Sequence, residues 1–305
     1  MNSATIRPLS WQEGGLFAPL LEELAGLFPT PAAFAAWREA VMAGLMIGRY
    51  AFLGVWNAES ETPRAGLLLE GSKDHRTVIA ELGTLVGEEL NAVMAALQGR
   101  TRAVTFDADL GADWAERLEP LGFKPFVRQT FVQDQSLVEY RDVPAGTLVI
   151  EPWDDSHREP VVALLATANA GTLDGLFLTM PDWPSPEACA AALDTMLAGR
   201  EGHFLPWASF VAREGEAFRG VILGVESAPG RQALLFDLAV HPAARGQNLS
   251  RRLVHAQQRA LVAHGFSELL FMTMAENTPV QRLFRREEIV RYEESRGGYW
   301  IRPTE

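Results

Sequence analysis

The sequence predicts a protein of the α/β (α+β) class that contains two copies of one fold. The chain has 305 residues, which exceeds the usual size of a single hydrophobic core, and 48% of them are hydrophobic. Strand-like and helix-like segments follow one another in the same order in both halves, and a repeat of this kind indicates a duplicated fold. We therefore expect two similar domains in which strands and helices alternate.

The repeated segments also locate the domain boundary. The matching pairs are a strand at 4–9 and 147–153, a helix at 30–37 and 185–192, and two further strands at 49–56 and 206–213 and at 64–70 and 219–226. Both helices open with a hydroxyl residue followed by proline, which is a helix-start signal. The stretch Asp142–Gly146, which contains Pro and Gly, lies between the halves. The sequence therefore predicts domains at 1–143 and 144–305.

The segment from 233 to 260 has the features of an anion site. An apolar strand from Ala233 to Phe236 continues to Pro242, and an amphipathic helix follows. The apolar face of that helix consists of Leu249, Leu253, Ala256 and Ala260. The free N–H groups in the first turn of this helix, together with Arg245, would converge on a phosphate or diphosphate group.

The residues in this loop resemble a known family motif. The run Leu238-x-Val240-x-Pro242-x-x-Arg245-Gly246 is similar to the acyl-CoA-binding motif of the GNAT acetyltransferases, whose loop reads (Arg or Gln)-x-x-Gly-x-(Gly or Ala). Asn248 stands where the family has Gly, and Ser250 stands where it has Gly or Ala. Asn enters the left-handed region more readily than other non-glycine residues, at about 1 kcal/mol, and Ser is small.

The surrounding elements agree with this resemblance. A second apolar strand is expected at 268–273, and Asn277-Thr278-Pro279 should open a helix with Thr278 as N-cap. The resemblance implies two tandem GNAT-like domains, each a mixed, mostly antiparallel sheet flanked by helices. It also implies acetyl-CoA (acyl-CoA) as co-substrate and no metal.

The resemblance implies a set of site residues. The residues expected to bind the cofactor are Leu238, Ala239, Val240, Arg245, Gly246, Gln247, Asn248, Leu249, Ser250, Asn277 and Phe284. Backbone N–H groups from Leu238 to Val240 would bind the thioester oxygen, and Asn277 would contact the pantetheine arm. Phe284 occupies the position at which the family usually has a Tyr that protonates the leaving thiolate. Asp237 and Glu226 are the candidate catalytic bases, and His241 is expected to be a turn residue.

The first half lacks the phosphate loop. At the matching position it reads from Glu81 to Leu90, has no Arg-Gly turn, and places Glu88 and Glu89 at the start of the next helix, where they would repel a phosphate. We therefore expect the first copy to be degenerate.

Composition narrows the classes of partner. The net charge of −12 argues against a nucleic-acid partner and weakly favours a cationic substrate such as an amine. No apolar run reaches the length of a membrane span and no export signal is recognised, so we expect a cytoplasmic protein. The single cysteine, Cys189, excludes an internal disulfide and is expected to be a buried residue on a helix. The oligomeric state is left open.

Three functions are compatible with these features. The first is an acetyl-CoA-dependent N-acetyltransferase that acts by direct attack of the amine of a small-molecule or peptide acceptor. The second is an acyl-CoA sensor without catalysis, indicated by Phe284 and Asn248. The third is a structural protein in which both copies are degenerate. For an acceptor pocket, the aromatic candidates are Phe177, Trp183, Phe204, Trp207 and Phe210, together with Met180.

Overall fold

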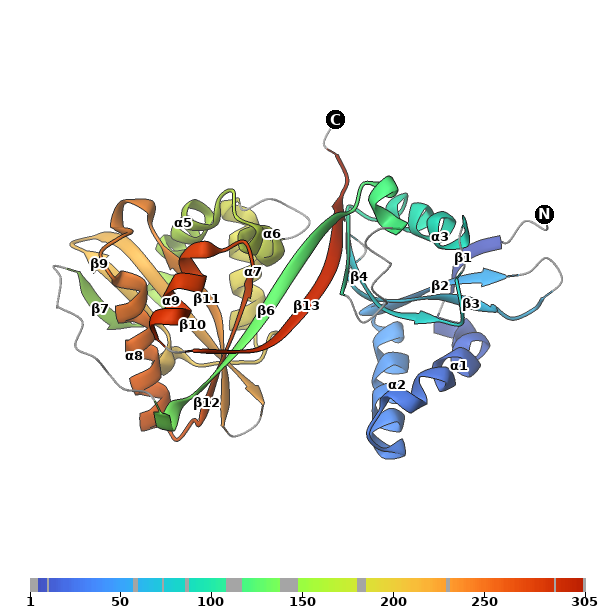
Figure 1. Cartoon of the computed structure of the whole chain (residues 1–305), viewed down its shortest axis with the longest axis horizontal. Coiled ribbons are helices and arrows are strands. Elements are labelled where there is room, and N and C mark those ends of the chain that lie inside the picture. Colours follow the sequence, from blue (N-terminus) through green and yellow to red (C-terminus); the bar gives the residue numbers. More distant parts are fainter. Residues whose placement is uncertain are drawn as a thin grey trace. The chain divides into compact units, whose positions relative to one another are not determined.

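The computed structural model describes residues 5–9, 11–56, 60–72, 74–85, 88–107, 117–137, 148–179, 185–228, 231–287 and 289–303. The chain forms two compact units (Figure 1). The first comprises Met1–Phe126 and Ser295–Glu305, and the second comprises Val127–Glu294. Within the described ranges, no helix is both long and apolar enough to cross a membrane.

The first unit is a mixed sheet with helices. Its elements are β1 (Thr5–Leu9), α1 (Gly14–Glu22), α2 (Pro31–Met46), β2 (Tyr50–Trp56), β3 (Ala65–Gly71), β4 (His75–Leu82), α3 (Glu88–Gln98), β5 (Ala103–Asp107) and the last part of β13 (Val290–Ile301). The strand order is β1-β2-β3-β4-β5-β13. Only the β4/β5 pair in this order is parallel.

The second unit repeats this arrangement. Its elements are β6 (Lys124–Asp134, from residue 127), β7 (Val149–Pro152), α5 (Arg158–Asn169), α6 (Leu173–Thr179), α7 (Pro186–Leu197), β8 (His203–Phe204), β9 (Phe210–Glu214), β10 (Ala217–Ala228), β11 (Gln232–Val240), α8 (Leu249–Ala263), β12 (Glu268–Met274), α9 (Thr278–Arg286) and the first part of β13. The strand order is β7-β9-β10-β11-β12-β6, with β8 beside β10. Only the β11/β12 pair in this order is parallel. The prediction of mixed, mostly antiparallel sheets flanked by helices is confirmed.

The two sheets also share a local irregularity. In the second unit Leu223 pairs with Asp237 and Gly224 pairs with Leu235, so that Phe236 is an extra residue in β11. In the first unit Leu68 pairs with Ala80 and Leu69 with Val78, which leaves Ile79 as the extra residue in β4. Each bulge comes directly after a parallel ladder of four residue pairs. A bulge re-aims the side chains that follow it, so the same distortion precedes the same strand end in both units.

The compact units divide the chain differently from the expected ranges of 1–143 and 144–305. The expected boundary at 142–146 lies outside the described residues. The difference arises because two strands join the sheet of the other half of the sequence. Residues 128–134 of β6 pair with β12 in the second unit, and residues 297–301 of β13 pair with β5 in the first. The C-terminal part of β13 thus supplies the last strand of the first unit.

Two hydrophobic cores cover the two faces of the second sheet. Val221 and Leu223 point to the face covered by α5 and α7, whereas Ile222 points to the face covered by α8 and α9. This alternation follows from the pleat of a strand. Figure 1 shows α8 and α9 in orange to red, separated by the sheet from the yellow-green α5 and α7. The predicted helix starts at Thr30 and Ser185 are present, since each hydroxyl accepts a bond from a backbone N–H three residues later, at 3.1 Å.

Candidate active site

The site begins where β11 and β12 stop pairing. Their parallel ladder ends at Leu235 and Phe271, and Phe236 bulges directly after it. Two cavities are lined by the ends of these strands. The first cavity has a volume of about 540 Å³ and reaches the loop before α8, and the second has a volume of about 410 Å³ and reaches the bulge. Both volumes are in the range of small-molecule sites.

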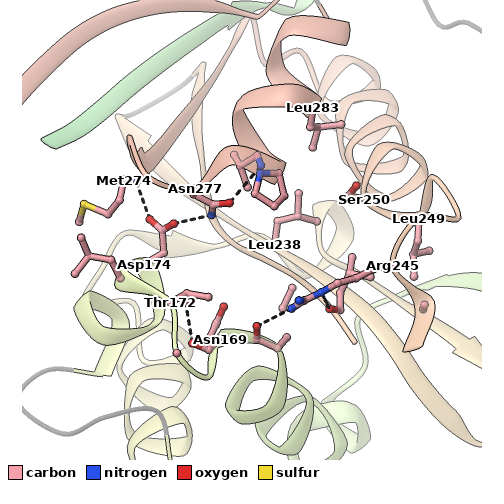
Figure 2. Close-up of a pocket in the computed structure, with 18 of the residues that line it drawn as sticks. Asn169, Thr172, Asp174, Leu238, Arg245, Leu249, Ser250, Met274, Asn277 and Leu283 are labelled. Atoms are coloured by element: carbon pink, nitrogen blue, oxygen red, sulfur yellow. Dashed lines mark hydrogen bonds between the residues drawn. The ribbon is translucent and has the colours of Figure 1, made fainter. Parts of the chain in front are cut away.

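The loop that closes the first cavity has the backbone that an anion site requires. Gly246 and Asn248 both have positive φ, at 79° and 57°. Asn248 precedes the first residue of α8 in the left-handed region, and its side chain does not cap the helix. Leu249 and Ser250, in the first turn of α8, line the cavity. The first turn of the helix therefore faces the cavity with its N-terminal partial positive charge (Figure 2).

Arg245 both lines the first cavity and braces its loop. Its Nη2 donates to the carbonyl of Ala168, at the end of α5, at 3.0 Å. Its Nε donates to the carbonyl of Val240 at 3.4 Å. These bonds place the guanidinium beside the end of β11, as Figure 2 shows. The guanidinium is thus held in position by two backbone carbonyls, and its positive charge is available to an anion.

Asp174, at the start of α6, connects three elements of the site. Its Oδ1 accepts a bond from the backbone N–H of Met274 at 2.8 Å. Its Oδ2 accepts bonds from the amide of Asn277 at 2.7 Å and from the hydroxyl of Thr273 at 3.1 Å. Asn277 in turn accepts a bond from the N–H of Val280, at 3.3 Å (Figure 2). The carboxylate therefore holds the end of β12 and the start of α9 beside α6.

Asp237 lies in the wall of the second cavity, one residue after the bulge. Its Oδ2 accepts a bond from the amide of Asn169 at 3.1 Å. Burial raises the pKa of Asp237 to about 6, the bond from Asn169 opposes this shift, and the nearby charge of Asp174 adds to it. A carboxylate with this pKa accepts a proton near neutral pH, as a general base must.

The structure places the predicted cofactor residues as follows. Those that line the first cavity are Leu238, Ala239, Val240, Arg245, Gly246, Asn248, Leu249, Ser250 and Asn277. Leu238 and Asn277 also line the second cavity. Gln247 lines neither cavity, because its exposed amide turns back to the carbonyl of Ala243 at 3.5 Å.

Two other expected site residues lie elsewhere. Phe284 lines the second cavity and not the first, and its ring is 3% exposed between those of Phe131 and Phe271. Glu226 lines neither cavity, since it lies near the far end of β10, where it pairs with His203. Its place in the sheet separates it from Asp237, so the two predicted bases are not brought together.

Three further expectations concern side chains near the site. Asn277 and not Thr278 is the N-cap of α9. His241 is a turn residue as expected, because its Nδ1 accepts the N–H of Ala243 at 3.2 Å. Cys189 is buried on α7 as expected, and burial and the nearby charge of Asp237 raise the pKa of its thiol to about 11.

The aromatic candidates divide between core and cavity. Phe177 lines the second cavity. Trp207 stacks on His264 with a centroid distance of 3.8 Å, and Phe204 lies edge-on to Trp153. Phe210 packs against the core on the α8 face. Met180 and Trp183 lie outside the described residues.

Three residues of the site, Asp174, Asn169 and Thr172, are not among those predicted from the sequence. Asn169 ends α5, Thr172 lies in the short connection that follows, and Asp174 lies in the first turn of α6. The hydroxyl of Thr172 accepts the N–H of Gly175 at 3.0 Å and thereby starts α6. The sequence feature that could have located these residues is the cluster of turn and cap residues between two helix patterns. Such a cluster predicts a turn, but it does not predict the contact with β12.

Comparison with known proteins identifies the class of this site. Residues 172–287 match the model of the acetyltransferase (GNAT) family, and this part of the chain is a GNAT domain. No curated protein matches the sequence.

Solved structures show the same fold over nearly the whole chain. A GCN5-related N-acetyltransferase from Sphaerobacter thermophilus is 15% identical with a TM-score of 0.62, covering 98% of this chain and 96% of that one. A tandem GNAT protein from the clavulanic acid biosynthesis pathway, solved without AcCoA, is 14% identical with a TM-score of 0.56, covering 99% and 100%. A GCN5-related N-acetyltransferase from Kribbella flavida is 12% identical with a TM-score of 0.51, covering 98% and 71%.

Proposed function

We propose that the second unit transfers an acetyl group from acetyl-CoA to the primary amine of a small-molecule or peptide acceptor. The observation that carries this proposal is the meeting of two cavities at the divergence of β11 and β12. The first cavity offers an uncapped helix start and Arg245 for the diphosphate, and the second offers Asp237. Six residues line both cavities, so their occupants would touch: Asn169, Asp174, Leu238, Met274, Asn277 and Val280.

The proposed reaction is a direct attack. The amine nitrogen forms a bond to the thioester carbonyl carbon, the C–S bond breaks, and coenzyme A leaves as a thiolate that takes a proton from solvent. The carboxylate of Asp237 takes the amine proton. The N–H of Leu238 donates to this carboxylate, so the candidate donors to the developing oxyanion are the backbone N–H groups that follow it, up to Val240. Holding both reactants in adjacent cavities supplies most of the reduction of the barrier.

The test is release of free thiol from acetyl-CoA in the presence of a panel of amines. Amine-dependent release that is lost in Asp237→Asn supports the proposal. Release that is equal in the two proteins would remove Asp237 from the mechanism.

A second candidate is an acyl-CoA-binding protein without turnover. The observation that favours it is Phe284, which has no hydroxyl and whose ring lies between two other phenylalanine rings. This candidate predicts acetyl-CoA binding with no transfer to any amine. A gain of transfer in Phe284→Tyr would indicate that the missing proton donor limits the wild-type protein.

We also propose that the first unit is a degenerate copy. Ala80 in β4 occupies the place of Asp237 relative to the bulge. In the loop after β4, the N–H of Leu85 donates to Glu81 at 2.6 Å and the N–H of Gly83 donates to Glu23 at 3.1 Å. Carboxylates of the protein thus occupy backbone donors near this strand end. The location of the protein in the cytoplasm stays a prediction.

A further inference from the structure

We infer that the acceptor is a cationic primary amine with an apolar body and no carboxylate group. The inference rests on the proposed function, because it assigns a substrate class to the second cavity. It starts from the charges on the cavity wall, which come from separate elements. Asp174, Glu201 and Asp237 contribute three carboxylates, and Arg128 contributes one guanidinium. Counted over its described residues, the wall therefore carries a formal excess of two negative charges.

The two inner carboxylates, Asp174 and Asp237, have no cationic partner in the described part of the chain. Among the described residues, no ion pair joins Asp174 or Asp237 to a cation. Asn169, a neutral donor, bonds to Asp237, and neutral donors also hold Asp174. The charge of Asp174 disfavours ionisation of Asp237, so the two groups are close enough to repel each other. An ammonium group in the cavity would relieve this repulsion.

Arg128, the cation among the described wall residues, contacts an aromatic ring. The guanidinium carbon of Arg128 lies 5.4 Å from the centroid of Phe177, over the ring. This contact holds the charge on β6 against α6, on the opposite side of β12 from β11. Arg128 therefore offsets only part of the negative field that an acceptor meets in this cavity.

Apart from Asn169, Thr273 and Asn277, which are neutral and polar, the described rest of the wall is apolar. Its large apolar side chains include Phe177, Leu178, Leu235, Phe271, Val280 and Phe284. A ring or alkyl chain binds such a surface by excluding water, whereas a second charge on the acceptor would be desolvated. An acceptor carboxylate would also be repelled by Asp174 and Asp237. The cavity thus selects for the ammonium group and against an added anion.

The test is calorimetric titration of three matched probes into the full-length protein, alone and saturated with CoA. The probes are phenethylamine, phenylalaninol, which adds a neutral hydroxymethyl group, and phenylalanine, which adds a carboxylate at the same carbon. We expect phenylalanine to bind at least tenfold more weakly than phenylalaninol. Equal or tighter binding of phenylalanine would overturn the inference, and so would a protein that binds acetyl-CoA but none of the three probes.

Matched variants separate the cavity charge from the overall charge. Glu201→Gln should reduce the discrimination against phenylalanine severalfold, whereas Glu216→Gln, in the exposed turn between β9 and β10, should leave it unchanged. An equal effect of the two variants would contradict a local origin. Failure of the proposed function is distinguishable, because it would appear as absent acetyl-CoA binding while the preference among the probes persists.

Discussion

Replacing Asp237 by Asn should stabilise the protein at neutral pH while impairing transfer. Burial, with a smaller contribution from Asp174, raises the pKa of Asp237 from 3.8 to about 6. The folded state therefore binds this proton more tightly than the unfolded state does. The contribution of Asp237 to stability is most favourable below about pH 4, becomes less favourable as the pH rises to about 6, and is constant above that.

The size of the effect follows from the difference between the pKa of Asp237 in the folded state and its ordinary value. At 1.36 kcal/mol per pH unit, the charged form costs up to about 3 kcal/mol above pH 6. Asn has nearly the same shape, and its oxygen accepts the bond that Asn169 donates to Asp237. Asp237→Asn should thus raise the free energy of unfolding by up to about 3 kcal/mol at pH 7.5 and leave it unchanged near pH 4.

The assay is urea unfolding of wild type and variant at both pH values. Glu216→Gln is the control, because it removes a negative charge from an exposed turn. A stabilisation of the same size at both pH values, or a loss of stability at pH 7.5, would refute the reasoning.

Four other changes should have measurable effects. Arg245→Glu should raise the Kd for acetyl-CoA about 10- to 100-fold and slightly lower the Tm, because a charge-assisted phosphate contact and the bond to Ala168 are lost; an unchanged Kd in calorimetry would contradict the site assignment. Asn248→Gly should raise the free energy of unfolding by about 1 kcal/mol without changing this Kd, since it removes left-handed strain and no capping bond; urea unfolding that shows a loss of stability would argue against this. Truncation after Glu294 should destabilise the first unit by at least about 2 kcal/mol, because β5 loses its partner strand and the core loses Trp300; an unaltered unfolding curve would contradict this. The value of kcat/KM should rise with pH through about 6, because Asp237 becomes a carboxylate there, beside Asp174, Glu201 and Arg128. If the same rise persists in Asp237→Asn, another group is responsible for the pH dependence.

The sequence predicts the local part of this site well. The strand, turn and helix around Arg245 depend on neighbouring residues, so Pro242, Gly246 and the left-handed Asn248 could be interpreted from their types. The fold class and the duplication were also accessible, because each half repeats the same order of hydrophobic segments. These features require no knowledge of which distant segments meet.

The long-range part of the site could not be predicted in this way. The contact of Asp174 with Met274 joins residues 100 positions apart, and nothing in either segment specifies the other. The same holds for the strands β6 and β13, which join sheets of the opposite half. His255 is an example in which a single helix does not reveal a long-range contact of one of its residues. It lies on α8, is 2% exposed and contacts Glu287 at 2.7 Å, and the pattern of the helix does not specify that distant partner.

Calorimetric titration of the full-length protein with acetyl-CoA tests the central claim most directly. We expect one site per chain and a clear loss of affinity in Arg245→Glu. Absence of binding would contradict the assignment of the first cavity to acyl-CoA, and two sites per chain would contradict the proposal that the first unit is degenerate.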